Sequence, residues 1–158
     1  MFRCYFEDGH ETTQLRHCCV DCVVTRAPDE VLMAKRTPSL KEGGKWGLIG
    51  GYMDRDEVIT EAAHREIMEE TGYNVEDLKL AKILSNPNRK GEDRQNVSLI
   101  LFCHATEKTG EPDWESTEQR WFKLSELPAP DEIAFDYLDA IKLYAKYLDK
   151  PFPLPILA

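Results

Sequence analysis

The chain has 158 residues, of which 42% are hydrophobic and 31% are charged, a composition typical of globular proteins. This length is enough for one domain with a hydrophobic core of its own. Its 20 basic and 29 acidic residues give a net charge of -9, which argues against a general binder of nucleic acids or anionic membranes. A small phosphorylated ligand remains compatible with this charge, because cations or a few basic side chains can reverse the field at one site.

The apolar segments and the cysteines predict a cytoplasmic protein. The first fifteen residues contain no apolar segment of the kind found in secretory signals. The longest apolar run, residues 97–103, is far shorter than the roughly 20 residues that span a bilayer. Five cysteines, an odd number, suit free thiols in a reducing compartment.

Three of the cysteines, Cys18, Cys19 and Cys22, lie close together and suggest an alternative site. Cys19 and Cys22 have a spacing that occurs in zinc sites. However, only one such pair is present, and it lies in an alternating strand pattern that places the two side chains on opposite faces. We therefore interpret these residues as packed thiols rather than zinc ligands.

The remaining patterns, in chain order, predict strands that come before, between and after two helices. Strands are expected at residues 15–25, 31–36, 46–53, 75–85, 97–106 and 118–124, and helices at 60–71 and about 131–148. This order predicts a mixed α/β fold in a single domain that spans residues 1–158. Within it, residues 1–14 form an N-terminal extension and the proline-rich residues 149–158 form a C-terminal arm.

The first helix combines an apolar stripe with an unusual number of carboxylates. Ile59, Ala63 and Ile67 recur at every fourth position, which predicts one buried face. At 100° per residue, Glu70 points between two of these apolar positions. A carboxylate that only made the protein soluble would be expected on the exposed face of the helix, not between apolar residues.

A surface helix with ion pairs such as Glu61–Arg65 is the ordinary interpretation of an acidic helix. This interpretation leaves Glu66, Glu69 and Glu70 unexplained, because carboxylates at this spacing converge on one patch and repel one another. A bound divalent cation would turn the repulsion into attraction, and carboxylate oxygens suit Mg²⁺ or Mn²⁺. The sequence therefore favours a cation site on this helix.

The spacing of these residues resembles the Nudix box, G-x5-E-x7-R-E-U-x-E-E-x-G-U, in which U is a bulky apolar residue. The matching residues are Gly51, Glu57, Arg65, Glu66, Ile67, Glu69, Glu70, Gly72 and Tyr73. The last of these departs mildly from the pattern because it is aromatic. Ile49 and Asp56 also depart from the Leu-Pro-Gly-Gly and Gly-Glu sequences that many members carry. The resemblance extends to the flanking strands and covers about residues 15–148.

The resemblance implies a Nudix fold, an α/β/α sandwich with a mixed β-sheet. It also implies an enzyme, a pyrophosphohydrolase that uses Mg²⁺ or Mn²⁺ to hydrolyse a nucleoside diphosphate linked to a further group X. The expected partner is a small nucleotide substrate, not nucleic acid or a membrane, and a homodimer is among the expected assemblies.

In the family, the carboxylates that match Glu66, Glu69 and Glu70 bind the cations, and the carbonyl group that matches Gly50 often adds a ligand. The residues that match Glu57 and Arg65 hold the loop and the helix in shape. A carboxylate near the cations takes a proton from water as general base. The sequence favours Glu69 for this role, with Glu115 or Glu118 in a later loop as the alternatives.

Candidate substrate-binding residues lie outside the helix. The cationic side chains of Arg36, Arg89 and Arg94 can bind phosphate, Gly51 lets the backbone approach an anion, and Trp114 can stack on a base. Family members that act on ADP-ribose often carry a proline about fifteen residues after the box, and Pro87 follows Tyr73 by 14 residues. This spacing favours ADP-ribose or a nucleotide sugar. The alternatives are a nucleoside triphosphate pyrophosphatase of the nucleotide-pool housecleaning type and a non-catalytic nucleotide-sensing domain.

Overall fold

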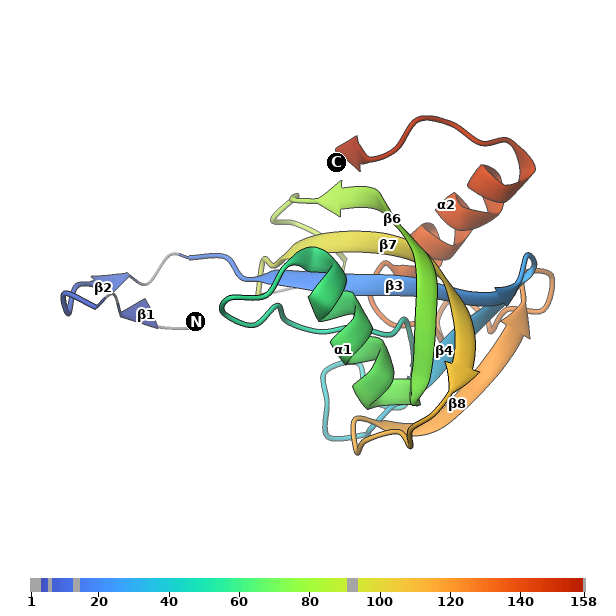
Figure 1. Ribbon diagram of the computed structural model, residues 1–158, viewed down its shortest axis with the longest axis horizontal. Helices are drawn as coiled ribbons and strands as arrows, with labels where there is room; N and C mark the ends of the chain where they lie inside the picture. The colour runs from blue at the N-terminus through green and yellow to red at the C-terminus, as the bar shows by residue number, and fades with distance from the viewer. Residues whose placement is uncertain (1–3, 6, 13–14, 91–93, 158) are drawn as a thin grey trace.

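The computed structural model describes residues 4–5, 7–12, 15–90 and 94–157. The N-terminal extension and the polar loop at 86–96 therefore fall partly outside the described residues. The elements, labelled in Figure 1, are β1 (Cys4–Tyr5), β2 (Glu11–Thr12), β3 (Cys18–Ala27), β4 (Glu30–Arg36), β5 (Trp46–Gly47), α1 (Ile59–Thr71), β6 (Tyr73–Leu84), β7 (Val97–Lys108), β8 (Ser116–Lys123), α2 (Tyr137–Asp149) and β9 (Ile156–Leu157).

A mixed sheet forms the centre of the fold. Its strand order is β5-β4-β3-β7-β6-β9, and β8 pairs with β4 outside this path. The central strands β3 and β7 run parallel, with Cys18 opposite Val97 and Thr25 opposite His104. By contrast, β4 runs antiparallel to β3, and β6 runs antiparallel to β7. The short hairpin of β1 and β2 extends away from this sheet (Figure 1).

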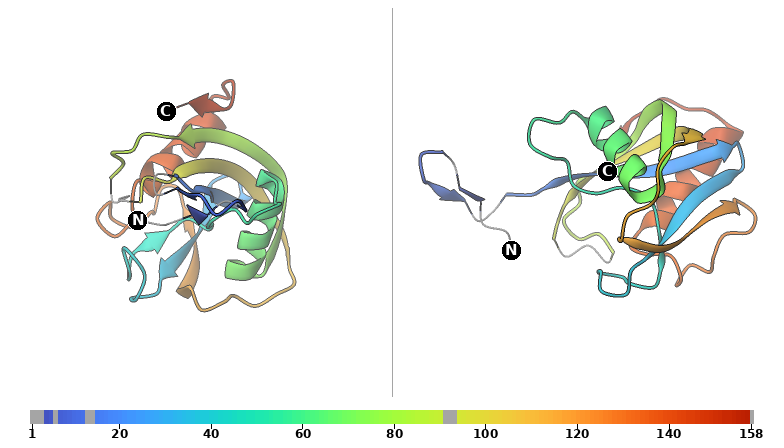
Figure 2. Two further views of the ribbon diagram at one scale, coloured as in Figure 1. Left: turned by 90° about the vertical axis from the view of Figure 1, so that its left-hand side faces the viewer. Right: turned by 60° about the horizontal axis from the view of Figure 1, so that its bottom comes forward.

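The sheet is covered on both faces, and this explains why its central strands are apolar almost throughout. Along β3, Val20 and Cys22 belong to the core on the α1 side, whereas Val23 belongs to the core on the α2 side. Ile67 of α1 and Ile141 of α2 are both fully buried in these two cores. The end-on view in Figure 2 shows the helices on opposite sides of the sheet, which confirms the predicted α/β/α sandwich.

Three predicted elements differ most from the structure, while the other predicted strands and the first helix agree with it to within three residues at each end. The second helix begins at Tyr137 rather than near residue 131, because Phe135 adopts a positive φ of 51° that interrupts a helix. The strand predicted at 46–53 is limited to β5, followed by isolated bridges to β3. The C-terminal arm ends in β9, which adds to the edge of the sheet beside β6.

Within the part of the chain that the structure describes, no helix is both long enough and apolar enough to cross a membrane.

Candidate active site

Residues at both ends of α1 cap the helix. The carboxylate of Glu61 accepts a hydrogen bond from the Val58 N–H at 2.9 Å and so caps the N-terminal turn. Gly72 closes the helix in the left-handed conformation, with φ of 74°, and donates its N–H to the Met68 carbonyl at 2.8 Å. The Arg65 guanidinium binds Glu57, Glu66 and Glu69 rather than Glu61, the partner that the ordinary interpretation of an acidic helix would give it.

The segment before α1 is held against the edge of β3 and brings the backbone close to the helix. The N–H groups of Cys22 and Val20 donate to the carbonyls of Ile49 and Gly51 at 2.8 and 2.9 Å. Gly50 lies between these contacts with φ of 148°. A Cβ atom at Gly50 would lie 2.0 Å from the Val20 carbonyl oxygen, so only glycine fits this position.

Glu70 occupies the position that the helical wheel predicts. Its side chain is 7% exposed, and it accepts a hydrogen bond from the Gly50 N–H at 3.1 Å. Burial raises the pKa of Glu70 well above its usual value, the Gly50 hydrogen bond opposes this shift, and the charges of Glu66 and Glu115 add to it. The carboxyl group is therefore costly to ionise unless a cation lies beside it.

Arg65 joins the loop and the helix through four different residues. Its guanidinium forms two hydrogen bonds with the Glu57 carboxylate, at 2.7 and 3.0 Å. It also donates to Glu66 at 2.8 Å, to Glu69 at 3.1 Å and to the Tyr52 carbonyl at 3.0 Å. The hydrogen bonds from Arg65, followed by one from the Asp54 N–H, lower the pKa of Glu57 to about 2. Arg65 is therefore a brace, by which we mean that it holds the loop before α1 in a fixed position against the helix.

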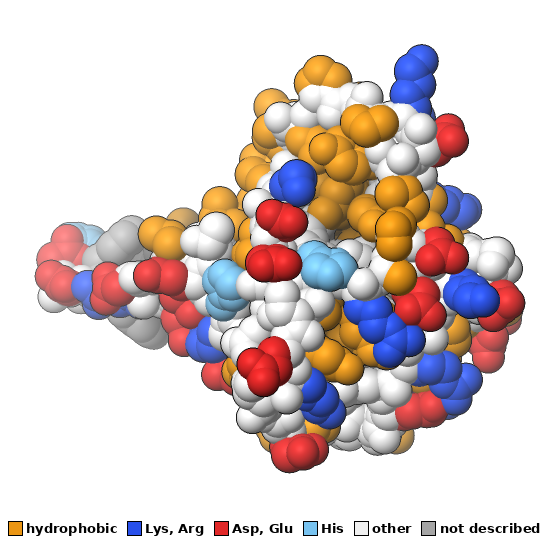
Figure 3. Space-filling model, turned by 45° about the vertical axis from the view of Figure 1, so that its right-hand side comes forward, with side chains coloured by type: hydrophobic (Ala, Val, Ile, Leu, Met, Phe, Trp, Pro, Cys, Tyr) orange, Lys and Arg blue, Asp and Glu red, His pale blue; other side chains and the backbone are white. Residues whose placement is uncertain are grey.

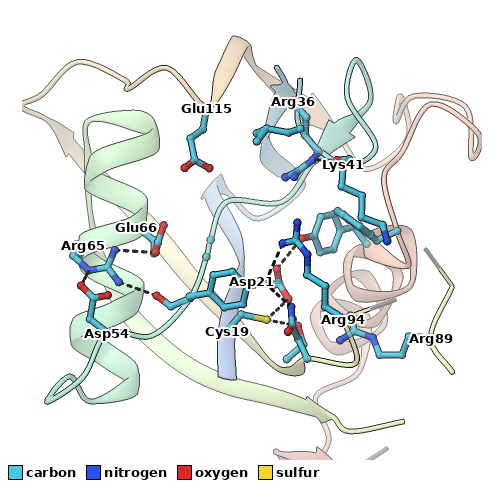
Figure 4. A pocket seen from close by; sticks show the side chains of 18 residues that line it. Cys19, Asp21, Arg36, Lys41, Asp54, Arg65, Glu66, Arg89, Arg94 and Glu115 are labelled. Carbon is cyan, nitrogen blue, oxygen red and sulfur yellow. Dashed lines mark hydrogen bonds and ion pairs between the residues drawn. The ribbon is translucent and has the colours of Figure 1, made fainter. Parts of the chain in front are cut away.

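A pocket of about 350 Å³ opens beside this brace, and Figure 4 shows its side chains. One end is acidic: Glu66 points inward from α1 and Glu115 points toward it from the loop before β8 (Figure 4). Backbone atoms of Gly50 and Gly51 line the pocket at the same end. The pocket therefore joins the carboxylates of the helix to the glycine segment.

The other end of the pocket is basic. Arg36, Lys41, Arg89 and Arg94 line it (Figure 4). Arg36 lies over the Phe135 ring at 5.2 Å and donates a hydrogen bond to the Lys41 carbonyl at 2.8 Å. Neither contact neutralises the positive charge of the guanidinium group. Arg89 instead forms a bidentate ion pair with Asp136, with both distances at 2.8 Å. Arg36 is thus better suited than Arg89 to meet an anionic ligand.

The structure brings only some of the predicted site residues into this pocket. Eight line it: Arg36, Gly50, Gly51, Arg65, Glu66, Arg89, Arg94 and Glu115. The other five, which are outside its lining, are Glu57, Glu69, Glu70, Trp114 and Glu118.

Each of these five has a different position. Glu57 lies behind the pocket as the partner of Arg65, and Glu70 is buried next to Gly50. Glu69 is half exposed beside Arg65. Trp114 is 67% exposed and does not line the pocket, and the Glu118 carboxylate pairs with Arg120 on the surface of β8.

The acidic end has the chemistry of a divalent-cation site. Burial raises the pKa of Glu66, and the charges of Glu69 and Glu115 raise it further. Burial also raises the pKa of Glu115, with a further contribution from Asp113. Carboxyl groups that disfavour one another's ionisation are stabilised by a shared cation, and an all-oxygen set suits Mg²⁺. Among the described side chains, no group of three or more histidine, cysteine, aspartate or glutamate residues is placed so that it could hold a metal ion by itself.

Comparison with known proteins identifies the family. The model of the NUDIX domain matches residues 15–144 of the chain. The chain belongs to the Nudix family. This Nudix chain is 30% identical over 132 residues to an ADP-ribose pyrophosphatase of Methanocaldococcus jannaschii, covering 81% of this chain and 72% of that protein. It is also 30% identical over 126 residues to the human 8-oxo-dGDP phosphatase NUDT18, covering 75% of this chain.

The Nudix chain spans 36% of the length of the human relative, and it resembles solved structures over most of their length. A NUDIX hydrolase from Nitrosomonas europaea superposes with a TM-score of 0.74 at 24% identity, covering 98% of this chain and 85% of that one. An ADP-ribose pyrophosphatase from Streptococcus suis superposes with a TM-score of 0.72 at 16% identity, covering 91% of this chain and 100% of that one. These likenesses confirm the Nudix fold.

Several residues that line the Nudix pocket were not predicted from the sequence. The largest group forms the floor between the acidic and basic ends and consists of Cys19, Asp21, Ser98 and Tyr137. Asp21 carries a signal that sequence reasoning could have used, because it is the only charged residue in the run from Cys18 to Thr25. The other three residues carry no comparable signal, since each is ordinary in a buried element.

The cysteines of β3 lie on both faces of the strand, as predicted. Cys22 is buried in the core on the α1 side, whereas Cys19 lines the pocket on the other face. Their thiols therefore cannot approach one ion together. Cys18 is exposed.

A second hollow of about 280 Å³ lies between β7 and the end of α2. It is lined mainly by Phe102, Tyr144, Tyr147, Leu148 and Pro151. Figure 3 shows hydrophobic side chains gathered in one area of the surface, with charged side chains around it. The rest of the lining of the hollow consists of Thr25, Asp77, Lys79, Cys103 and His104.

Proposed function

We propose that this chain is a divalent-metal-dependent Nudix pyrophosphohydrolase that cleaves the diphosphate bond of a nucleoside diphosphate linked to a group X. The observation that carries the proposal is the pocket itself, in which Glu66 and Glu115 face a basic wall beside a glycine backbone. The complete Nudix box and the pyrophosphatases among the relatives support it. The family, the fold and this pocket favour catalysis over a purely nucleotide-sensing role.

The residues of the acidic end divide into ligands and braces. Glu66, Glu70 and the Gly50 carbonyl would hold Mg²⁺ or Mn²⁺, and Glu69 would contribute from the edge of the same helix. A bound cation neutralises phosphate oxygens and lowers the pKa of water. Arg65 holds the Glu66 carboxylate in place through a hydrogen bond of 2.8 Å, while Glu57 holds Arg65. Arg36 and Arg94 lie where they can bind the phosphate oxygens.

We favour Glu115 over Glu69 as the general base, although the sequence favoured Glu69. Glu115 points into the pocket toward Glu66, and its carboxyl pKa is raised by burial and by Asp113, toward the range useful for proton transfer. The Glu69 carboxylate faces the surface and accepts a hydrogen bond from Arg65. In this assignment Glu115 takes one proton from the attacking water, and the diphosphate bridge oxygen leaves with the second product.

Substitution Glu115→Gln tests this assignment. It is expected to lower kcat by about 10²–10⁴-fold, the usual contribution of a general base. The acid limb of the pH–kcat profile should also disappear, because Glu115 must be ionised to accept a proton. Glu118→Gln is the matched control and should change kcat by less than about threefold, since the Glu118 carboxylate pairs with Arg120 outside the pocket. Equal losses in the two variants would contradict the assignment.

Arg65→Lys tests the brace. Lysine cannot form the bidentate contact with Glu57 and reach Glu66 together, so we expect kcat/KM to fall about 10–100-fold, as for other residues that orient metal ligands. A higher Mg²⁺ concentration for half-maximal rate should accompany the loss. Arg55→Lys is the control, because the Arg55 side chain is 82% exposed. An unchanged Mg²⁺ requirement in Arg65→Lys would show that Arg65 does not position the ligands.

For the substrate, we propose ADP-ribose or a related nucleotide sugar. The spacing of Pro87 and the likeness to the Methanocaldococcus jannaschii ADP-ribose pyrophosphatase support this choice. The likeness to the 8-oxo-dGDP phosphatase NUDT18 favours a housecleaning role as the second candidate. Measuring kcat/KM for ADP-ribose, UDP-glucose, dGTP and 8-oxo-dGDP under identical conditions separates the two. A preference for the oxidised nucleotide would overturn the ADP-ribose proposal while leaving the hydrolase proposal in place.

A further inference from the structure

The floor of the pocket is polar at a place where the fold favours apolar side chains. On the α2 side of the sheet, Val23, Ile100 and Phe102 form the core. Closer to the pocket, the same face carries Asp21 and Ser98, which are 5% and 0% exposed. Burying such groups costs free energy that an apolar residue would not cost.

Asp21 is held in one orientation by its neighbours. The Tyr137 hydroxyl donates to Oδ1 at 2.8 Å, and the Ser98 hydroxyl donates to Oδ2. The Cys19 thiol lies 3.9 Å from Oδ2 and adds a weak contact. Each carboxylate oxygen can accept about two hydrogen bonds, so Oδ1, which accepts the Tyr137 hydrogen bond, has capacity for one more donor, and Asp21 lines the pocket from which a ligand could supply it.

The charges around Asp21 restrict what part of a ligand can approach it. A phosphate group would be repelled by the carboxylate, so the diphosphate belongs near Glu66 with its cations and near Arg36 at the basic end. Figure 4 shows Asp21 between these two ends. The part of the ligand over the floor should therefore carry no negative charge and should offer N–H or O–H groups, as the base and the ribose of a nucleotide do.

We propose that Asp21 is a specificity-determining residue that accepts a hydrogen bond from an N–H or O–H donor on the nucleoside portion of the substrate. The donor is an amino group of the base or a hydroxyl of the ribose. Ser98 and Tyr137 act as positioning residues that fix the carboxylate. This inference rests on the proposed function, since it deepens the substrate assignment of the same pocket.

The test uses the full chain with Mg²⁺ and calorimetric titration of nucleoside monophosphates, which bind without being hydrolysed at a diphosphate. Three pairs differ by one donor: AMP and purine riboside 5′-monophosphate, GMP and IMP, and AMP and 2′-deoxy-AMP. We expect the wild type to prefer the donor-bearing member of at least one pair by about tenfold or more in Kd. Asp21→Asn should reduce that ratio to about threefold or less. The pair affected identifies base or ribose as the donor.

Glu118→Gln is the control, because the Glu118 carboxylate pairs with Arg120 and does not line the pocket. It should change both members of each pair alike. The absence of discrimination in the wild type would overturn the proposal, even if Asp21→Asn fails to fold. Unchanged ratios in a folded Asp21→Asn would also overturn it and would assign Asp21 to anchoring Tyr137 alone. Neither result depends on hydrolysis, so a failure of the proposed function would be seen separately.

Discussion

Glu70→Gln is expected to lower kcat with Mg²⁺ by at least about 100-fold. Even residues that only orient a metal ligand account for about 10–100-fold, and Glu70 is proposed as a ligand itself. Glutamine keeps an oxygen that can accept the 3.1 Å hydrogen bond from the Gly50 N–H, so the loop should hold its conformation. The loss would therefore follow from the missing negative charge. A variant with more than about a third of the wild-type kcat would contradict the role of Glu70.

The same substitution should stabilise the protein when no metal is present. The folded-state pKa of Glu70 is raised by burial, so ionisation disfavours the folded state. This penalty is absent below the unfolded-state pKa and grows as pH rises through the raised folded-state pKa. In EDTA, thermal unfolding should give Glu70→Gln a higher Tm than the wild type, and the difference should increase with pH. Each kcal/mol would correspond to about 2–4 °C.

Mg²⁺ should reverse this order of stability. It binds the ionised carboxylate, so the wild type should gain more in Tm than Glu70→Gln does when Mg²⁺ is added. A wild type that is more stable than Glu70→Gln in EDTA at every pH would contradict the cost assigned to this buried carboxyl group.

Gly50→Ala is expected to destabilise the fold by about 2–6 kcal/mol and to remove activity. The φ of 148° is accessible essentially to glycine alone, at a cost of about 1–3 kcal/mol for another residue. The added Cβ would also lie 2.0 Å from the Val20 carbonyl oxygen, and backbone in a packed sheet gives way only at a further cost of about 1–3 kcal/mol. Thermal or urea unfolding measures the change.

Two other glycines provide controls for this prediction. Gly44 has φ of 81°, and an added Cβ there would meet no atom within 4 Å, so Gly44→Ala isolates the backbone cost of about 1–2 kcal/mol. At Gly51 a Cβ would lie 2.6 Å from the Glu66 carboxylate, a side chain that can move. Gly51→Ala should therefore reduce kcat while changing stability little. Equal destabilisation by all three substitutions would contradict the close approach at Gly50.

The sequence predicted best those features of the fold that depend on local periodicity and spacing. The fourfold recurrence in α1 located the helix to within one residue at its start and placed Glu70 on the buried side, where the structure has it. Apolar runs located the central strands. Both signals arise from local geometry, since the periods of helices and strands fix which side chains share a face.

The sequence was least informative about contacts between distant segments. Trp114 and Glu115 are neighbours, yet only Glu115 lines the pocket, because the conformation of the loop decides which side chain points inward. Arg89, which was predicted to bind phosphate, lines the pocket but also pairs with Asp136, which lies 47 residues away in the chain, and the sequence does not reveal this pairing. No local pattern encodes such pairings. Of the polar floor, Asp21 alone has a local signal, and its contacts with Ser98 and Tyr137 join segments far apart in the chain.

Hydrolysis of ADP-ribose with Mg²⁺ or Mn²⁺, compared with the same reaction in EDTA, tests the central claim most directly. The products should be identified by chromatography. We predict AMP and ribose 5-phosphate with either metal and no turnover in EDTA, with a nucleoside monophosphate released from any other nucleotide diphosphate that is accepted. Metal-independent turnover, or no turnover of ADP-ribose, UDP-glucose, dGTP and 8-oxo-dGDP with either metal, would contradict the account.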